Sequence, residues 1–188
     1  MSGFIYSLDY AIGDWLNKTL AHPVLDVVFK VITSLGDAGW FWIALSVVLL
    51  CFKKTRRYGV SMALSLLFSL FVTNLFLKPL VDRPRPYELR AIELRIDPPH
   101  DASFPSGHTS ASFAAALALF WHNKKAGAPA LVLATLIGFS RLYFYVHFFT
   151  DVLAGSLVGF LVSVAAYLLT PYLYKGFDKL KQAMKKNA

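Results

Sequence analysis

The sequence predicts an all-α fold: a polytopic membrane helix bundle of about five or six embedded helices, with amphipathic interfacial helices at both termini. Two observations predict it. Of the 188 residues, 56% are hydrophobic and the mean hydropathy is +0.52, which is more apolarity than one water-soluble core of this size can bury. The apolar residues also gather in long runs between short basic clusters. The lipid bilayer is therefore the expected solvent, and we expect residues 1–188 to form a single integral membrane domain.

Residues 3–20 predict the first helix, because apolar residues recur there at helical spacing. Asp9 and Asp14 interrupt this pattern, so we expect the helix to lie in the membrane interface and not to cross it. Residues 21–36 contain an apolar stretch shorter than the roughly 20 residues that a span needs. The sequence leaves open whether they cross the membrane and on which side the N-terminus lies.

Longer apolar runs predict the embedded helices, at residues 38–52, 58–77, 105–122, 128–146 and 148–170. Residues 78–104 are polar, proline-rich and charged, so we expect them to form an extramembrane loop, and a loop of that length usually has a function. Pro171 ends the last run. Beyond it, four apolar residues share one helical face, which predicts a surface helix on anionic lipid, with a frayed terminus as the alternative. They are Leu173, Phe177, Leu180 and Met184.

The basic residues indicate how the chain is oriented. Lys and Arg tend to stay on the cytoplasmic side, so the cluster Lys53–Arg57 is expected inside. Alternating helices then place Lys124, Lys125 and the lysine-rich tail inside too, and residues 78–104 outside. Lipid headgroups and cytoplasmic loops account for the net charge of +8, so no nucleic-acid partner is expected. These features predict a multi-pass protein of the cytoplasmic membrane; its oligomeric state is left open.

Three fragments expected on the outer side place charged or titratable residues beside apolar runs, where charges are costly and usually mark function. They are Lys78 to Pro86, Pro105 to His108, and Ser140 to Asp151. In the third fragment, His147 and Asp151 stand four residues apart, so on a helix they share a face. The carboxylate would fix the tautomer of the imidazole and favour its cation, leaving the other ring nitrogen to attack or bind. Taken alone, this spacing fits a structural His–Asp pair or a helix cap better than a catalytic pair.

The second fragment reads as the start of a helix. Pro105, Ser106 and Gly107 suit a cap and a tight entry, so backbone N–H groups would point outward, as in phosphate sites at helix N-termini. His108 follows directly and could give a proton to a leaving oxygen. An ordinary capped helix start is the alternative.

The cations of the first and third fragments could surround a phosphoryl group. Arg85 and Arg141 supply planar forks, and Lys78 supplies a point charge. The alternatives are a snorkelling Lys78 and a solvated Arg85. Arg141 lies inside an apolar run, which argues against the same explanation for it.

Together the fragments resemble the three motifs of the type 2 phosphatidic acid phosphatase superfamily, which also includes vanadium haloperoxidases and acid phosphatases. The motifs are a Lys followed after six residues by Arg-Pro, then Pro-Ser-Gly-His, then Ser-Arg followed after five residues by His and after three more by Asp. Every position matches, and the resemblance spans about residues 60–170. The matching residues are Lys78, Arg85-Pro86, Pro105 to His108, Ser140-Arg141, His147 and Asp151.

The resemblance implies a metal-independent reaction without a cofactor. His147 would attack phosphorus and become a transient phosphohistidine, Asp151 would orient it, and His108 would protonate the leaving oxygen. Further residues would hold the phosphoryl oxygens, namely Lys78, Arg85, Ser106, Gly107 and Arg141. Phosphoryl transfer depends mostly on positioning and charge stabilisation, which three cations can supply.

The resemblance also narrows the substrate to a lipid phosphate. Small bacterial members of the superfamily dephosphorylate undecaprenyl diphosphate, phosphatidylglycerol phosphate, phosphatidate or lipid A, and the compact chain is most similar to the undecaprenyl diphosphate phosphatases. Tyr87, Arg90 and His100 are possible headgroup contacts; the alternative is a mobile loop without a role in specificity. Other hypotheses for the chain are a haloperoxidase, a transporter of phosphorylated lipid, or a sensor with an inactive site.

Overall fold

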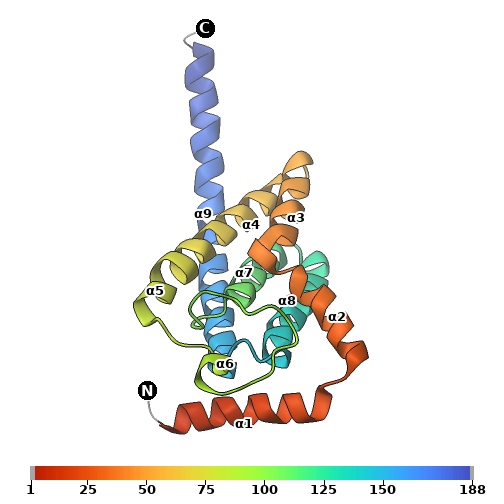
Figure 1. Ribbon diagram of the computed structural model, residues 1–188. Helices are drawn as coiled ribbons and strands as arrows, with labels where there is room; N and C mark the ends of the chain where they lie inside the picture. The colour runs from red at the N-terminus through yellow and green to blue at the C-terminus, as the bar shows by residue number, and fades with distance from the viewer. Residues whose placement is uncertain (1–2, 187–188) are drawn as a thin grey trace.

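The computed structural model describes the backbone of residues 3–186 and the side chains of residues 3–175 (Figure 1). Over this range the chain is helical without a strand, which confirms the all-α prediction. In chain order the elements are α1 (Gly3–Leu20), α2 (Pro23–Ser34), the 3₁₀ turn η1 (Asp37–Gly39), α3 (Trp40–Cys51), α4 (Arg56–Ser69), the π-helical η2 (Leu70–Leu77), α5 (Lys78–Val81), α6 (Pro86–Leu89), α7 (Gly107–His122), α8 (Lys124–Tyr143) and α9 (Phe149–Lys186).

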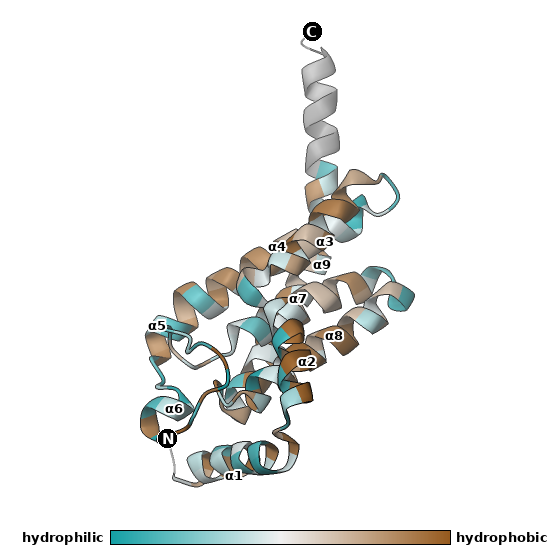
Figure 2. Cartoon of the chain, turned by 45° about the vertical axis from the view of Figure 1, so that its right-hand side comes forward, coloured by the Kyte–Doolittle hydropathy of each residue, from teal (hydrophilic) through white to brown (hydrophobic). Residues whose placement is uncertain are grey.

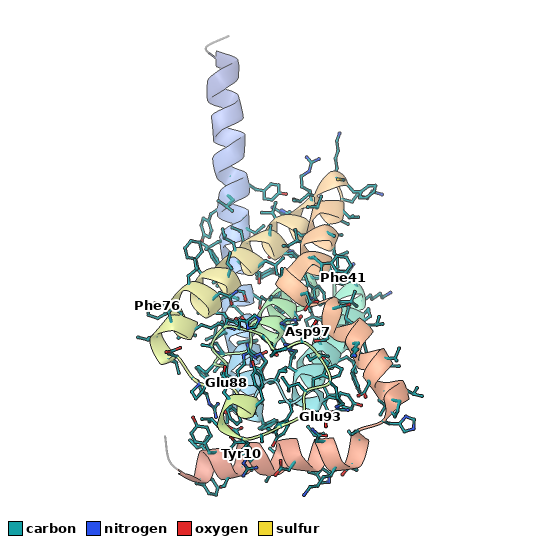
Figure 3. The ribbon with its side chains drawn as sticks, viewed as in Figure 1. Tyr10, Phe41, Phe76, Glu88, Glu93 and Asp97 are labelled. Carbon is teal, nitrogen blue, oxygen red and sulfur yellow. The ribbon has the colours of Figure 1, made fainter. Side chains whose placement is uncertain are left out.

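Three stretches are long and apolar enough to cross a membrane: Arg56–Leu89, Lys124–Tyr143 and Phe149–Lys175. The α2–α3 pair, bent by 43°, would make a fourth if its two helices form one span. Figure 2 shows hydrophobic residues along α4 and α8. Large apolar side chains point outward, as Phe76 does with 62% of its surface exposed (Figure 3). This apolar exterior is what a bilayer requires, so the chain is a multi-pass membrane protein. The count of five or six embedded helices stays a prediction.

Helix α7 lies at the centre of the bundle, against α4, α8 and α9. Small residues make this close packing possible: a Cβ added at Gly155 of α9 would lie 2.7 Å from the Ser106 carbonyl oxygen. The Ser65 hydroxyl of α4 donates to the Ala114 carbonyl of α7 at 2.7 Å. The regularly spaced small residues of these helices therefore serve packing.

The predicted loop begins later than expected. The π-helical η2 continues into α5, so Lys78 lies inside a helical segment, and the helix ends only at Asp82, whose φ is +44°. The Lys78 side chain is buried and paired with Asp101 instead of reaching toward headgroups. The boundary of the loop therefore lies at Asp82 and not at the end of the apolar run before Lys78. Between Asp82 and Ser106 the chain is irregular apart from the single turn α6.

The two terminal helices differ from their predictions in instructive ways. Helix α1 crosses one end of the bundle, at the bottom of Figure 1, but its Asp9 is buried at 2% exposure and is not a solvated interruption. Helix α9 does not stop at Pro171 but continues through it, although a proline inside a helix removes one N–H of the ladder and crowds the carbonyl four residues earlier. The side chains of Phe177, Leu180 and Met184, which define the expected surface helix, lie outside the described residues.

Candidate active site

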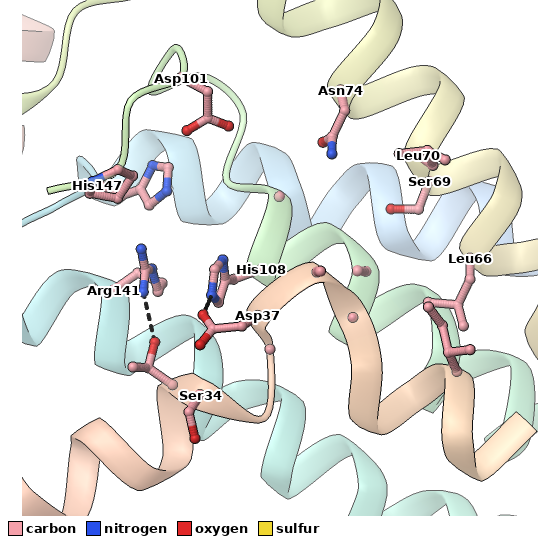
Figure 4. A pocket seen from close by; sticks show the side chains of 18 of the residues that line it. Ser34, Asp37, Leu66, Ser69, Leu70, Asn74, Asp101, His108, Arg141 and His147 are labelled. Atoms are coloured by element: carbon pink, nitrogen blue, oxygen red, sulfur yellow. Dashed lines mark hydrogen bonds and ion pairs between the residues drawn. The ribbon is translucent and has the colours of Figure 1, made fainter. Parts of the chain in front are cut away.

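The three sequence fragments meet at one cavity of about 1250 Å³ (Figure 4). The end of η2 and α5, the start of α7, the last turn of α8 and the turn before α9 each contribute to its polar end. The predicted site residues that line it are Lys78, Arg85, Gly107, His108, Arg141 and His147. Helices that are distant in sequence therefore bring these groups to a single place.

His147 and Asp151 pair by a different route from the one predicted. His147 lies in the turn before α9 and not on the helix, and Tyr145 of that turn takes a φ of +60°. Asp151 stands in the first turn of α9, so its Oδ2 lies 3.6 Å from His147 Nδ1. A sharp turn followed by a helix start thus replaces the shared helical face.

The protonation of His147 also differs from the expectation. Burial lowers the pKa of His147 to about 3, against the opposing effect of Asp151, and nearby Arg85 lowers it further. The sequence favoured the cation, because spacing reports the carboxylate but not the loss of water around a side chain that is only 2% exposed. At physiological pH the imidazole is therefore neutral, which is the form of the ring that can attack an electrophile.

A network that the sequence did not reveal holds Asp151. Its Oδ2 accepts from the Ser103 hydroxyl at 2.5 Å and from the Phe148 N–H at 2.9 Å. Its Oδ1 accepts from Arg83 Nη1 at 2.6 Å. With both oxygens bonded, the carboxylate has one orientation, and it faces the imidazole of His147.

Arg83 links this network to α1. Its Nη2 donates to Asp9 Oδ2 at 2.7 Å, and its guanidinium lies over the Phe148 ring, 4.0 Å from the centroid. Asp9 also accepts from the Thr150 N–H at 2.9 Å, which caps the start of α9. A signal existed in the sequence: Asp9 lies four residues after Ile5 on the apolar face of its helix.

Two of the expected phosphate-binding cations already have an anionic partner. Arg85 Nη2 donates to Asp101 Oδ1 at 2.6 Å, and Lys78 Nζ pairs with the other oxygen of the same carboxylate. Burial alone would raise the pKa of Asp101, but Lys78 and Arg85 lower it to about 2. Arg85 Nη1 also contacts His147 Nε2 at 3.3 Å, so this ring nitrogen faces the cations while Nδ1 faces Asp151.

Arg141 has no such partner. Its side chain is buried in the last turn of α8, and Nη1 donates to the Thr33 hydroxyl at 2.8 Å. Among residues 3–175, no carboxylate forms an ion pair with it, and its buried Nε has no hydrogen-bond partner. A buried cation without a counter-charge is costly, so the arrangement favours an anionic ligand.

His108 has an acidic partner as well. Its Nε2 lies 2.9 Å from Asp37 Oδ1, in the turn that joins α2 and α3 (Figure 4). This approach requires a glycine next to it, because a Cβ on Gly36 would lie 2.6 Å from the His108 ring. The residue Gly39 in the same turn takes a φ of +68°. The turn between two helix segments therefore serves to carry Asp37 to the site.

Comparison with known proteins identifies the family. Residues 55–175 match the sequence profile of the PAP2 superfamily. The chain belongs to this superfamily. The motif-based prediction is thereby confirmed, and with it the class of enzyme, a lipid phosphatase.

Relatives within the PAP2 superfamily agree with this class. Undecaprenyl-diphosphatase BcrC of Bacillus subtilis is 31% identical over 161 residues, covering 81% of this chain and 80% of that protein. The structure of LpxE from Aquifex aeolicus superposes with a TM-score of 0.77 at 30% identity, covering 88% and 98% of the two chains. A PAP2-type phosphatidylglycerolphosphate phosphatase from Bacillus subtilis gives a TM-score of 0.70 at 30% identity, covering 95% and 88%.

Not every predicted site residue lines the cavity. The Ser106 side chain is fully buried beside it, and its hydroxyl accepts from Thr109 Oγ1 at 3.0 Å. Of the possible headgroup contacts, Tyr87 donates to the Pro99 carbonyl at 2.6 Å, and Arg90 stacks on α1 with its guanidinium 3.7 Å from the Tyr10 ring centroid. The side chain of His100 is exposed and does not line the cavity.

A different part of the chain between α6 and α7 lines the cavity instead. The lining residues there include Leu94, Ile96, Pro99 and Asp101. Within residues 3–175, no group of three or more His, Cys, Asp or Glu side chains could hold a metal ion. A reaction without a metal or cofactor stays a prediction.

Proposed function

We propose that this PAP2 protein hydrolyses undecaprenyl diphosphate to undecaprenyl phosphate and inorganic phosphate at the outer face of the cytoplasmic membrane, without a metal. The observation that carries the proposal is the buried, unpaired guanidinium of Arg141 in the same cavity as the buried neutral imidazole of His147. The first group needs an anion, and the second can attack one. A phosphoryl group satisfies both requirements.

The reaction follows from the orientation of His147. Its Nε2 faces the cations and attacks phosphorus, while its Nδ1 is held toward Asp151. The bond from phosphorus to the leaving oxygen breaks, and His108 gives that oxygen a proton. Arg141 and the cations near it stabilise the charge on the transferring group.

In the second step, water attacks the phosphohistidine and returns a proton to His108. The bond between phosphorus and His147 Nε2 breaks, and inorganic phosphate is released. The Asp151 network keeps the imidazole in one orientation through both steps, since both carboxylate oxygens are already bonded.

The rest of the cavity suits a lipid chain. From the polar end it extends between α3 and the continuous α4–η2 segment along Ile43, Val47, Leu67 and Leu70, four exposed apolar side chains. An apolar passage open toward the bilayer can admit a substrate whose phosphate reaches the cations while its chain stays among lipids. The relative named undecaprenyl-diphosphatase supports a prenyl chain. Phosphatidylglycerol phosphate is the second candidate, because a structural neighbour carries that activity in its name.

The decisive experiment measures phosphate release by the purified protein in detergent, with EDTA present, from undecaprenyl diphosphate, phosphatidylglycerol phosphate and phosphatidate. We expect fastest turnover of the diphosphate and inhibition by vanadate. A requirement for added magnesium would contradict the metal-free reaction. No release from any of the three lipids would refute the function.

Sidedness needs a separate test. In a Cys51→Ser background, an Asp97→Cys variant should react with a membrane-impermeant maleimide in intact cells, since Asp97 lines the exposed mouth of the cavity. A Lys54→Cys variant, on the opposite side by the charge pattern, should react only after lysis. The reverse result would place the site on the inner face.

A further inference from the structure

The carboxylate of Asp101 stands where a phosphoryl group is expected. It comes from the irregular chain between α6 and α7, and its side chain remains 56% exposed at the cavity (Figure 4). One oxygen is bound by Lys78 and the other by Arg85 Nη2 at 2.6 Å. The two carboxylate oxygens thus occupy two of the cations that are expected to hold a phosphoryl group.

The attachment of Asp101 allows its side chain to leave without opening the loop. Arg85 Nε donates to the backbone carbonyl of Asp101 at 2.8 Å, and the Ser103 N–H donates to the Arg83 carbonyl at 2.8 Å. The backbone is therefore held at Asp101 itself and again two residues later. Rotation of an exposed side chain is fast and local.

Any ligand must compete with this resident anion. A carboxylate carries one negative charge, and a terminal phosphate carries about −1.5 to −2 near pH 7, with three free oxygens. A phosphodiester headgroup carries one charge and two free oxygens. Lys78, Arg85 and the unpaired Arg141 therefore stabilise the charge of a terminal phosphate more strongly than that of Asp101. They stabilise a phosphodiester about as strongly as Asp101.

We propose that Asp101 is a specificity-determining residue that competes for Lys78 and Arg85, admitting terminal phosphates and excluding the phosphodiester headgroups of bulk phospholipids. The inference rests on the proposed function, since it takes the cavity to hold a phosphoryl group. It gives the site a physical basis for recognising a rare terminal phosphate among abundant diesters in the same bilayer.

The experiment measures binding of inorganic phosphate and of dimethyl phosphate, a soluble phosphodiester, to the purified full-length protein, through the shift in melting temperature. We expect Asp101→Asn to bind inorganic phosphate about tenfold tighter than the wild type, because a charge-assisted competitor is lost. Dimethyl phosphate should raise the melting temperature of the variant and leave that of the wild type unchanged. Asp101→Ala should change both affinities in the same direction.

The matched control is Glu93→Gln. Glu93 is exposed on the same loop (Figure 3), does not line the cavity and forms no ion pair among residues 3–175, so the variant removes the same charge without the contact. It should bind both anions as the wild type does. An equal gain in anion affinity in this control would mean that losing any negative charge on the loop has the same effect, and it would overturn the proposal.

Equal or weaker phosphate binding by Asp101→Asn would also overturn it, because the carboxylate would then position the cations instead of competing for them. Neither readout involves turnover. A wild-type protein that passes this binding test but releases no phosphate from lipids would refute the proposed function and leave the role of Asp101 standing.

Discussion

Arg141 is a residue where stability and activity are expected to conflict. Arg141 is 3% exposed, and among the described side chains its guanidinium donates a hydrogen bond only to the Thr33 hydroxyl. Without a bound anion, the protein therefore bears the cost of desolvating this charge. We expect Arg141→Met, which has a similar length and no charge, to keep or raise the melting temperature while kcat/KM falls at least about 100-fold. Thermal unfolding and phosphate release measured on one preparation would check this. A lower melting temperature would show that Arg141 stabilises the fold.

His147 provides a pH-dependent prediction. Burial lowers its pKa to about 3, below the value of the unfolded chain. As the pH falls from about 6.5 toward 3, the unfolded chain therefore takes up a proton that folded His147 does not, and stability decreases. Replacing His147 by Gln should abolish turnover and also flatten this loss of stability.

The measurement compares chemical unfolding of the wild type and His147→Gln at pH 7.5 and pH 5. The wild type should lose more stability than the variant between the two values. Equal losses would mean that His147 is not buried as a neutral ring. Residual turnover near the wild-type rate would contradict its role as nucleophile.

At the scale of residues, the motif positions could be predicted because their spacing is characteristic. Their partners could not. Nothing in the spacing tells which of the loop carboxylates folds back, so Asp101 looked like one of several scattered acids. Asp37 lies far from the motifs in sequence and reaches His108 only because two glycines shape its turn.

Among the elements, α1 is the least expected participant. Asp9 links it to the start of α9 and, through Arg83, to Asp151. We expect Asp9→Asn to lower kcat at least about tenfold with little change in KM. Arg83 would lose the carboxylate that anchors it, and Asp151 would then lose the fixed position from which we propose that it orients His147. Steady-state kinetics with a lipid substrate would measure it.

Asp14→Asn is the matched control on the same helix. Asp14 accepts from the Tyr145 hydroxyl at 2.6 Å and pairs with the exposed Arg90, so it also fastens α1 but does not contact Arg83. If both variants lose kcat equally, docking of α1 explains the result. A selective loss in Asp9→Asn supports the link to Asp151.

Apolar runs and charged clusters were enough to place most helices. These patterns gave the wrong helix boundaries where local features of the fold differ from what hydropathy and charge predict. Pro171 does not end α9, and the helix continues past Lys78, whose charge is paired within the protein. The bend between α2 and α3 depends on backbone angles at Ala38 and Gly39 that composition does not report.

For the molecule as a whole, the apolar passage between α3 and α4 can be tested apart from the chemistry. Leu67 lines it and is 46% exposed, so Leu67→Trp should fill the passage without disturbing the core. We expect KM for the lipid substrate to rise about tenfold, while hydrolysis of p-nitrophenyl phosphate, which has no chain, stays unchanged.

Leu136→Trp, on the outside of α8 and away from the cavity, controls for the added bulk, since Leu136 is also partly exposed at 38%. It should leave both activities unchanged. Equal losses on the two substrates in Leu67→Trp would mean that the residue supports the site itself.

The overall arrangement was also only partly predictable. The family and the helical class follow from motifs and hydropathy. The convergence of the three fragments depends on α7 packing against its neighbours through small residues such as Gly155, which a linear pattern does not encode. The positive-inside argument for the outer face concerns the bilayer and stays a prediction.

The carboxylate of Asp101 between Lys78 and Arg85 has a consequence for medicinal chemistry. It indicates that the head of an antagonist needs more than one negative charge, as a phosphonate has, because a carboxylic acid would only replace the carboxylate that Asp101 already supplies. Joined to a hydrocarbon that follows the Leu67 side of the passage, such a compound would use contacts that the protein already makes with itself.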